Sequence, residues 1–190
     1  MKKELLSQVY QHQLISSDEL QKIIDSHQKI TLKKGDFILK EGEIANSYFI
    51  LENGLIRSFA YDYNGNDITT DFFCNYDVVI EVLSLFQRTP TQENIQALTD
   101  CIGWKIDLDV FQDLYHSIPG VSEWGRHWMT GKLFQSKQRF LEMITTSAKN
   151  RYENLIKEKP QVILQSPLKH IASYLGITDT SFSRIRKEIS

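Results

Sequence analysis

Residues 167–189 read PLKHIASYLGITDTSFSRIRKEI, and this stretch decides how the chain is interpreted. Apolar side chains first recur at i, i+3, i+4 and i+7, the spacing of one helix face, at Leu168, Ile171, Ala172 and Leu175. A second apolar set follows at Phe182, Ile185 and Ile189. Gly176 lies between the two sets, where a glycine suits the left-handed exit from a helix. The small Ala172 lets two helices cross closely. The pattern predicts a helix-turn-helix whose second helix covers residues 179–189.

The outer face of this second helix carries short hydroxyl side chains and then cations. In a helix-turn-helix the second helix enters the DNA major groove, with hydroxyls and guanidinium groups near base edges and other groups near phosphates. We expect base contacts from Thr180, Ser181 and Arg184, phosphate contacts from Lys169, Ser183 and Lys187, and a DNA-proximal role for Thr178 at the helix start. The alternative is an ordinary helical hairpin with no DNA function.

The charge is divided unevenly along the chain. The 190 residues carry a net charge of −2, but residues 132–190 hold 11 Lys and Arg against 5 Asp and Glu. Residues 1–131 hold 11 against 19. A basic C-terminal segment that follows an acidic body is typical of a nucleic-acid-binding module attached to a domain with another task.

Composition excludes several classes of protein. Hydrophobic content of 41% and charged content of 24% are typical of a soluble globular chain. Two cysteines cannot form a disulfide framework, the five histidines lack metal-ligand spacing, and we expect neither a metal nor another cofactor. The N-terminus has no apolar signal region and no run of about 18 apolar residues exists, so we expect a cytoplasmic protein without a membrane span. No nucleophile elbow, phosphate loop or carboxylate pair indicates an enzyme.

The first half of the chain reads as two helices followed by short strands. Residues 3–12 and 16–28 have helical patterns, and Ser16 with Glu19 forms a capping-box signal. Strands rich in β-branched and aromatic residues then repeat, closed by Gly, Asn or Asp, with two more at 95–107 and a helix after them. Asn64-Gly65 predicts a two-residue type I′ hairpin. Such regular short strands predict a β-sandwich or β-roll.

A long helix is predicted for about residues 121–146, after the break at Pro119-Gly120. Its apolar face is too broad for one neighbour. We expect the roll to cover one edge and a symmetric copy of the helix to cover the other, through Trp128, Leu133, Phe140 and Ile144. A purely internal core helix is the alternative. Another helix is predicted at 148–159, and any wing of the helix-turn-helix is expected from an upstream strand such as 162–166.

The order of these elements resembles the cyclic-AMP receptor/fumarate-nitrate regulator (Crp/Fnr) family of bacterial transcription factors. The resemblance covers nearly the whole chain, with its anchors in KKGDFILKEGEIANSYFILENGLIRSF (33–59), which has Gly35, Gly42 and Gly54 at the start of the roll, and in SYLGITDTSFSRIRK (173–187). The short regulators of Bacteroidetes-like groups are the most similar members. The resemblance implies a homodimer that binds a palindromic operator in double-stranded DNA and contacts RNA polymerase.

The resemblance also implies an effector pocket in the roll, whose residues depart from the nucleotide-binding pattern. Glu81 matches the family's glutamate, but Ile80 replaces its glycine. Thr91 and Gln92 stand where an Arg-Ser pair holds the phosphate, so the cation is missing. Arg88 is near but out of register, and we include it as a candidate substitute. Glu81 could contact a ribose hydroxyl or be retained only for packing. We expect no cyclic nucleotide in this pocket, and either an unidentified small molecule or no effector.

These observations define an α+β chain of three parts. Residues 1–118 form the N-terminal helices and a cyclic-nucleotide-binding-like β-roll (a double-stranded jelly roll). Residues 119–146 form a long dimerisation helix, and residues 147–190 form a winged-type helix-turn-helix. The function expected is DNA-binding transcription regulation by a homodimer. The alternative is a ligand-binding regulatory module that acts through protein contacts.

Overall fold

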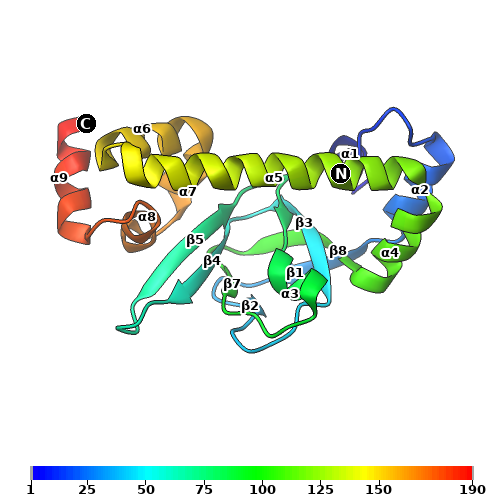
Figure 1. Ribbon diagram of the computed structural model, residues 1–190, viewed down its shortest axis with the longest axis horizontal. Coiled ribbons are helices and arrows are strands. Elements are labelled where there is room, and N and C mark those ends of the chain that lie inside the picture. Colours follow the sequence, from blue (N-terminus) through cyan, green and yellow to red (C-terminus); the bar gives the residue numbers. More distant parts are fainter. Residues whose placement is uncertain (1, 190) are drawn as a thin grey trace.

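The computed structural model describes residues 2–189, arranged along the long helix α5 (Figure 1). The β-roll lies against the middle of α5, the N-terminal helices and α4 lie at one end, and helices α6 to α9 lie at the other end. The helices are α1 (Lys2–Val9), α2 (Ser17–Asp25), α3 (Val82–Gln87), α4 (Leu108–Ser117), α5 (Pro119–Thr145), α6 (Ala148–Glu158), α7 (Pro160–Gln165), α8 (Leu168–Tyr174) and α9 (Asp179–Ile189). The strands are β1 (Gln28–Leu32), β2 (Phe37–Leu39), β3 (Ser47–Asn53), β4 (Ile56–Tyr61), β5 (Asp67–Phe73), β6 (Val78–Val79), β7 (Asn94–Ala97) and β8 (Cys101–Asp107).

The strands form two antiparallel sheets, which confirms the predicted roll. Their orders are β1-β8-β3-β6 and β2-β7-β4-β5. Side chains from both sheets meet in one core, with Ile50 and Ile56 fully buried and Phe73 and Ile95 nearly so. Apolar side chains of β-branched and aromatic types fit this half-buried, pleated surface. In the second sheet β5 is an edge strand, paired with β4 on one side only.

The N-terminal helices α1 and α2 pack on the roll through apolar side chains that belong to its core. Ser16 caps α2, and its backbone N–H donates in return to the Glu19 carboxylate, so the predicted capping box is confirmed. Trp124 on α5 donates its indole N–H to the carbonyl of Val9, 2.6 Å away, which joins the first helices to the long helix. The predicted long helix is also confirmed, since α5 has 27 residues from Pro119 to Thr145.

The β4–β5 hairpin differs from its prediction. Asn64-Gly65 was expected to form a two-residue type I′ turn, which needs positive φ at both positions. Only Gly65 has a positive φ, of 80°. Instead the Asp62 carboxylate accepts hydrogen bonds from the backbone N–H groups of Asn64 and Asn66, at 2.8 Å each. These hydrogen bonds to the Asp62 side chain stabilise a loop over residues 62–66, which is longer than the predicted two-residue turn.

The segment expected to supply a wing is also different. Residues 162–166 lie in or just after helix α7, not in a strand, and within residues 2–189 no strand follows Asp107. Pro160 at the first turn favours the helix, because its fixed φ suits that position. Val162 is completely buried in the core beneath α8, so tertiary packing overrides its β propensity.

A second core joins the C-terminal helices to the roll. Its buried members from the helices are Tyr152, Leu155, Val162, Ile171, Ala172, Leu175 and Phe182. Its members from the roll are Leu55, Phe72 and Leu98. The roll and the helix-turn-helix therefore share one apolar interface.

The first core contains a buried polar group that generates a pH prediction. His27 lies between the Ile23 carbonyl, 2.7 Å from Nδ1, and the Tyr10 hydroxyl, 3.1 Å from Nε2. Burial lowers the pKa of His27 to about 4, although the bond to Ile23 acts in the opposite direction. The unfolded chain therefore binds more protons than the folded one between about pH 6.5 and 4.

We expect the free energy of unfolding to fall as the pH drops through this window. The contribution of His27 is on the order of 1–3 kcal/mol and is fully present only above about pH 6.5. Urea titrations at several pH values measure it, with His27→Gln giving a flatter profile than the parent. His127→Gln, at an exposed position, is the matched control. A parental slope that His27→Gln leaves unchanged contradicts the assignment.

Candidate nucleic-acid interface and effector pocket

Helices α8 and α9 have the geometry of a helix-turn-helix. Gly176 between them has a φ of +68°, as the left-handed exit requires. The backbone N–H of Ile177 donates to the Ala172 carbonyl at 3.1 Å and closes the turn. Ala172 is 1% exposed at the helix crossing. A methyl group at Gly176 would also meet the end of Met143 on α5, so this turn contacts the long helix.

Helix α9 is held by one buried side chain and by its N-terminal cap. Phe182 is 1% exposed and packs edge-on against the ring of Tyr152, with centroids 4.9 Å apart. The Thr178 hydroxyl accepts from the backbone N–H of Ser181 at 3.2 Å, and its side chain also bonds the Ser181 hydroxyl. Thr178 thus serves as the cap of the helix that was expected to read DNA.

The residues predicted to contact DNA are all exposed and gather at one end of the molecule (Figure 1). Those on α9 are Thr180, Ser181, Ser183, Arg184 and Lys187, and Lys169 joins them from α8. The buried Phe182 faces the opposite way, so the helix is amphipathic with its polar side free. This arrangement can place hydroxyls, a guanidinium group and ammonium groups in a DNA groove.

The long helix leaves an apolar stripe uncovered beyond the roll. Leu133, Phe140 and Ile144 are 66%, 58% and 66% exposed. Met129, Phe134, Leu141 and Met143 are also exposed. Trp128, the fourth predicted dimer residue, is half-buried and stacks on Trp124 within the protomer, with centroids 6.5 Å apart. The structure therefore separates Trp128 from the other three.

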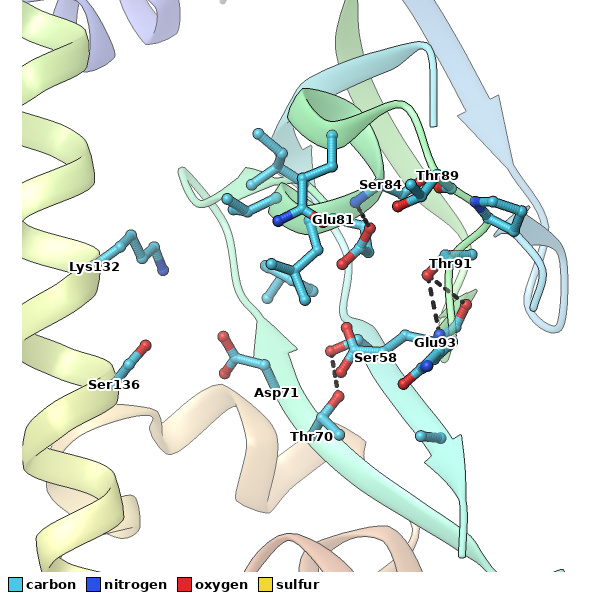
Figure 2. A pocket seen from close by; sticks show the side chains of 18 of the residues that line it. Ser58, Thr70, Asp71, Glu81, Ser84, Thr89, Thr91, Glu93, Lys132 and Ser136 are labelled. Carbon is cyan, nitrogen blue, oxygen red and sulfur yellow. Dashed lines mark hydrogen bonds between the residues drawn. The ribbon is translucent and has the colours of Figure 1, made fainter. Parts of the chain in front are cut away.

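A cavity of about 610 Å³ lies between the roll and α5. Figure 2 shows its walls, with Asp71, Glu81 and Glu93 from the roll and Lys132 and Ser136 from α5. Further lining comes from Ser58, Thr70, Ser84, Thr91, Gln92, Trp128 and Arg139. The carboxylates and the cations thus lie on different walls.

The polar groups of the roll wall are mostly engaged with one another. Glu81 is buried and its carboxylate caps α3 by accepting from the backbone N–H of Ser84. The Thr91 hydroxyl accepts from the backbone N–H of Glu93 at 3.0 Å. Burial raises the pKa of Glu93, and the neighbouring carboxylates of Glu81 and Asp71 raise it further. The roll wall is therefore acidic, and the backbone amide of Ser84 on α3 is already bonded to the Glu81 carboxylate.

Three of the four predicted pocket residues line this cavity, and the fourth does not. Glu81, Thr91 and Gln92 are on its wall. Arg88 is outside the lining, which corrects its prediction as a pocket cation. Its guanidinium donates to the Ala45 carbonyl at 2.8 Å and to the Asn46 side chain at 2.6 Å. Arg88 ends α3 in the left-handed conformation, with a φ of 58°, and this bend aims its side chain away.

Sequence reasoning missed the cations of the α5 wall. Lys132 and Arg139 lie on the long helix, far along the chain from the roll motifs, and Asp71 lies on β5. They were not assigned because α5 was interpreted only through its apolar residues. The seven-residue spacing of Lys132 and Arg139 puts both on one helix face and was the available signal.

No group of three or more His, Cys, Asp or Glu side chains that could hold a metal ion occurs in residues 2–189. In the same residues, no helix combines the length and the apolar character that crossing a bilayer requires.

Comparison with known proteins agrees with this architecture. Residues 29–117 match the family described as "Cyclic nucleotide-binding domain". The chain is 24% identical over 180 residues to the fumarate and nitrate reduction regulatory protein of Yersinia pestis, covering 88% of this chain and 70% of that protein. The match continues past the roll into the C-terminal helices.

Solved structures show the same fold. The structure of FixK2 from Bradyrhizobium japonicum has a TM-score of 0.76 at 18% identity and covers 86% of this chain and 84% of that one. A protein from Eubacterium rectale described under the crp/fnr family has a TM-score of 0.70 at 17% identity, over 91% and 82% of the two chains. In its roll, its long helix and its helix-turn-helix, taken in this order, the chain is similar to the Crp/Fnr regulators, and its residues 29–117 match the cyclic nucleotide-binding domain.

Proposed function

We propose that the protein is a DNA-binding transcription regulator that binds a palindromic operator as a homodimer. The observation that carries this proposal is helix α9, which is fixed by the buried Phe182 and presents its hydroxyls and cations to solvent. In this proposal residues 1–118 form the β-roll that supplies one wall of the effector pocket, residues 119–146 dimerise and residues 147–190 bind DNA. Contact with RNA polymerase belongs to the same proposal. Selection of bound sequences from a random DNA pool tests it, and no enrichment favours a module that acts through protein contacts.

The first prediction separates base readout from phosphate contact on α9. Arg184→Ala should cost ~1–3 kcal/mol of binding to the selected operator and relax its sequence preference at one base pair, because a bidentate guanidinium–guanine contact is worth about that. Lys187→Ala should weaken all sequences alike and reduce the salt slope by about one. Fluorescence anisotropy on operator and random DNA measures both. Equal losses on both DNAs for both variants contradict the assignment.

The second prediction concerns the uncovered stripe on α5. Leu133, Phe140 and Ile144 expose large apolar side chains on one helix, which a second copy of α5 would cover. Phe140→Glu places a carboxylate in that interface, where an unpaired charge is costly. We expect sedimentation to change from dimer to monomer and operator affinity to collapse, since a palindrome needs both half-sites held together.

A matched control keeps this test specific. Tyr63→Glu introduces the same charge at a 97% exposed aromatic residue on the β4–β5 loop, away from α5. It should leave both the dimer and operator affinity intact. A parental protein that sediments as a monomer at micromolar concentration refutes dimerisation through α5.

The third prediction is that neither cyclic AMP nor cyclic GMP binds tightly. A phosphodiester moved out of water without a paired cation costs several kcal/mol. The roll wall, where the resemblance places the phosphate, provides no cation: Glu81 already occupies the Ser84 amide, Glu93 and Asp71 add negative charge, and Lys132 and Arg139 lie on the opposite wall. An uncharged or cationic molecule suits this wall better. Calorimetry with either nucleotide up to millimolar concentration should give no saturable heat. Micromolar binding that Arg139→Gln abolishes would show that the α5 wall holds the phosphate.

A further inference from the structure

The outer edge of β5 exposes backbone groups that no strand can satisfy. β5 is the last strand of its sheet, with β4 on its inner side. An edge strand leaves every other N–H and C=O group without a ladder partner, and an unpaired buried group is costly. Strand β5 lies beside α8, and the part of its edge at residues 69–72 meets side chains from the helices (Figure 1).

Side chains from three helical segments fill this edge in order along the strand. The Thr69 N–H donates to the Ser173 hydroxyl on α8 at 3.2 Å. The Thr70 carbonyl accepts from the Arg139 guanidinium on α5. The Phe72 carbonyl accepts from the ammonium group of Lys159, between α6 and α7. Three edge groups thus have partners from the helices, and the Phe72 N–H donates to the Asp71 carboxylate of β5 itself at 2.8 Å.

An ion pair accompanies the Lys159 contact, and a cation–π contact accompanies that of Arg139. Lys159 also lies 3.1 Å from the Asp71 carboxylate. Burial alone would lower the pKa of Lys159, but Asp71 raises it above its ordinary value, so the ammonium group stays charged. The Arg139 guanidinium, which bonds to β5, also donates to the Tyr174 carbonyl of α8. It lies 3.8 Å from the centre of the Tyr174 ring.

A buried cluster fixes α8 from the inner strand. Arg57 on β4 is 3% exposed and makes two hydrogen bonds of 2.6 Å to Asp67. The same guanidinium donates to Nδ1 of His170 on α8 at 2.7 Å. Burial lowers the pKa of His170 to about 4, and the charge of Arg57 acts in the same direction. The neutral imidazole is therefore an acceptor, and α8 is held by side chains from both strands of the β4–β5 hairpin.

We propose that the outer edge of β5 is a docking site for the helix-turn-helix and that Lys159 positions α9 for DNA through it. The docked state holds α9 beyond the end of α5, with its polar face free (Figure 1). The docking rests on the contacts above. Its effect on DNA affinity rests on the proposed function.

The test compares two lysines near the C-terminal end of α6. Lys159→Glu places a carboxylate against Asp71 and the Phe72 carbonyl, so repulsion replaces both contacts. Lys157→Glu makes the same charge change two residues earlier, at an exposed position on α6. Lys159→Arg retains the cation and its donors. Hydrogen exchange of peptides covering 67–73 is measured in the free protein, and operator affinity is measured across salt concentrations.

We expect faster exchange at 67–73 only in Lys159→Glu, together with about tenfold weaker operator binding. The salt slope should stay at the parental value, because Lys159 bonds to β5 and not to a phosphate. In Lys159→Arg, both the hydrogen exchange at 67–73 and the operator affinity should stay at the parental values. Unchanged exchange in Lys159→Glu overturns the docking site. Equal affinity losses in the two glutamate variants, or a salt slope reduced by about one in Lys159→Glu, overturn the positioning role. Altered exchange in a protein that binds no DNA leaves the docking intact and refutes the proposed function instead.

Discussion

The unpaired edge of β5 is the constraint on which the arrangement of this chain depends. A sheet edge must be paired, covered or exposed to water, and here it is covered. Lys159, Arg139 and Ser173 each provide a donor or an acceptor to it from a different helical segment. Phe72 from the same strand is fully buried among the apolar residues of the C-terminal helices. The polar contacts at the strand edge and the apolar contacts of Phe72 thus both hold the helix-turn-helix in the same position.

The same hairpin also forms a wall of the cavity. Thr70 and Asp71 of β5 line the pocket, as does Arg139 of α5, and these residues also hold the docked helices. A molecule that bonded to the Asp71 carboxylate would compete directly with Lys159. The wall of the pocket and the contacts that hold the helix-turn-helix therefore share side chains, without a chain of intermediate contacts between them. Coupling of this kind needs a ligand with different affinity for the docked and undocked states.

The two walls of the cavity differ in charge. A carboxylate caps α3 from inside the pocket, through Glu81 and the Ser84 amide. The cations lie opposite, on α5, where Lys132 faces the cavity. The match to the cyclic nucleotide-binding domain covers residues 29–117, which include the roll but end before α5. Similarity of the roll alone therefore carries no information about the cationic wall.

The sequence by itself determined the local structure wherever one short pattern dominated. The 3.6-residue periodicity with Gly176 and Ala172 predicted both helices of the helix-turn-helix, and Ser16 with Glu19 predicted the start of α2. These features depend on hydrogen bonds and packing between near neighbours. The tertiary structure decided what depends on distant segments: that residues 162–165 are helical over the second core, that Arg88 turns away from the cavity, and that Arg57 meets His170 across 113 positions. The edge of β5 belongs to this second group, because a strand's free hydrogen-bonding groups acquire partners only when the chain returns to cover them.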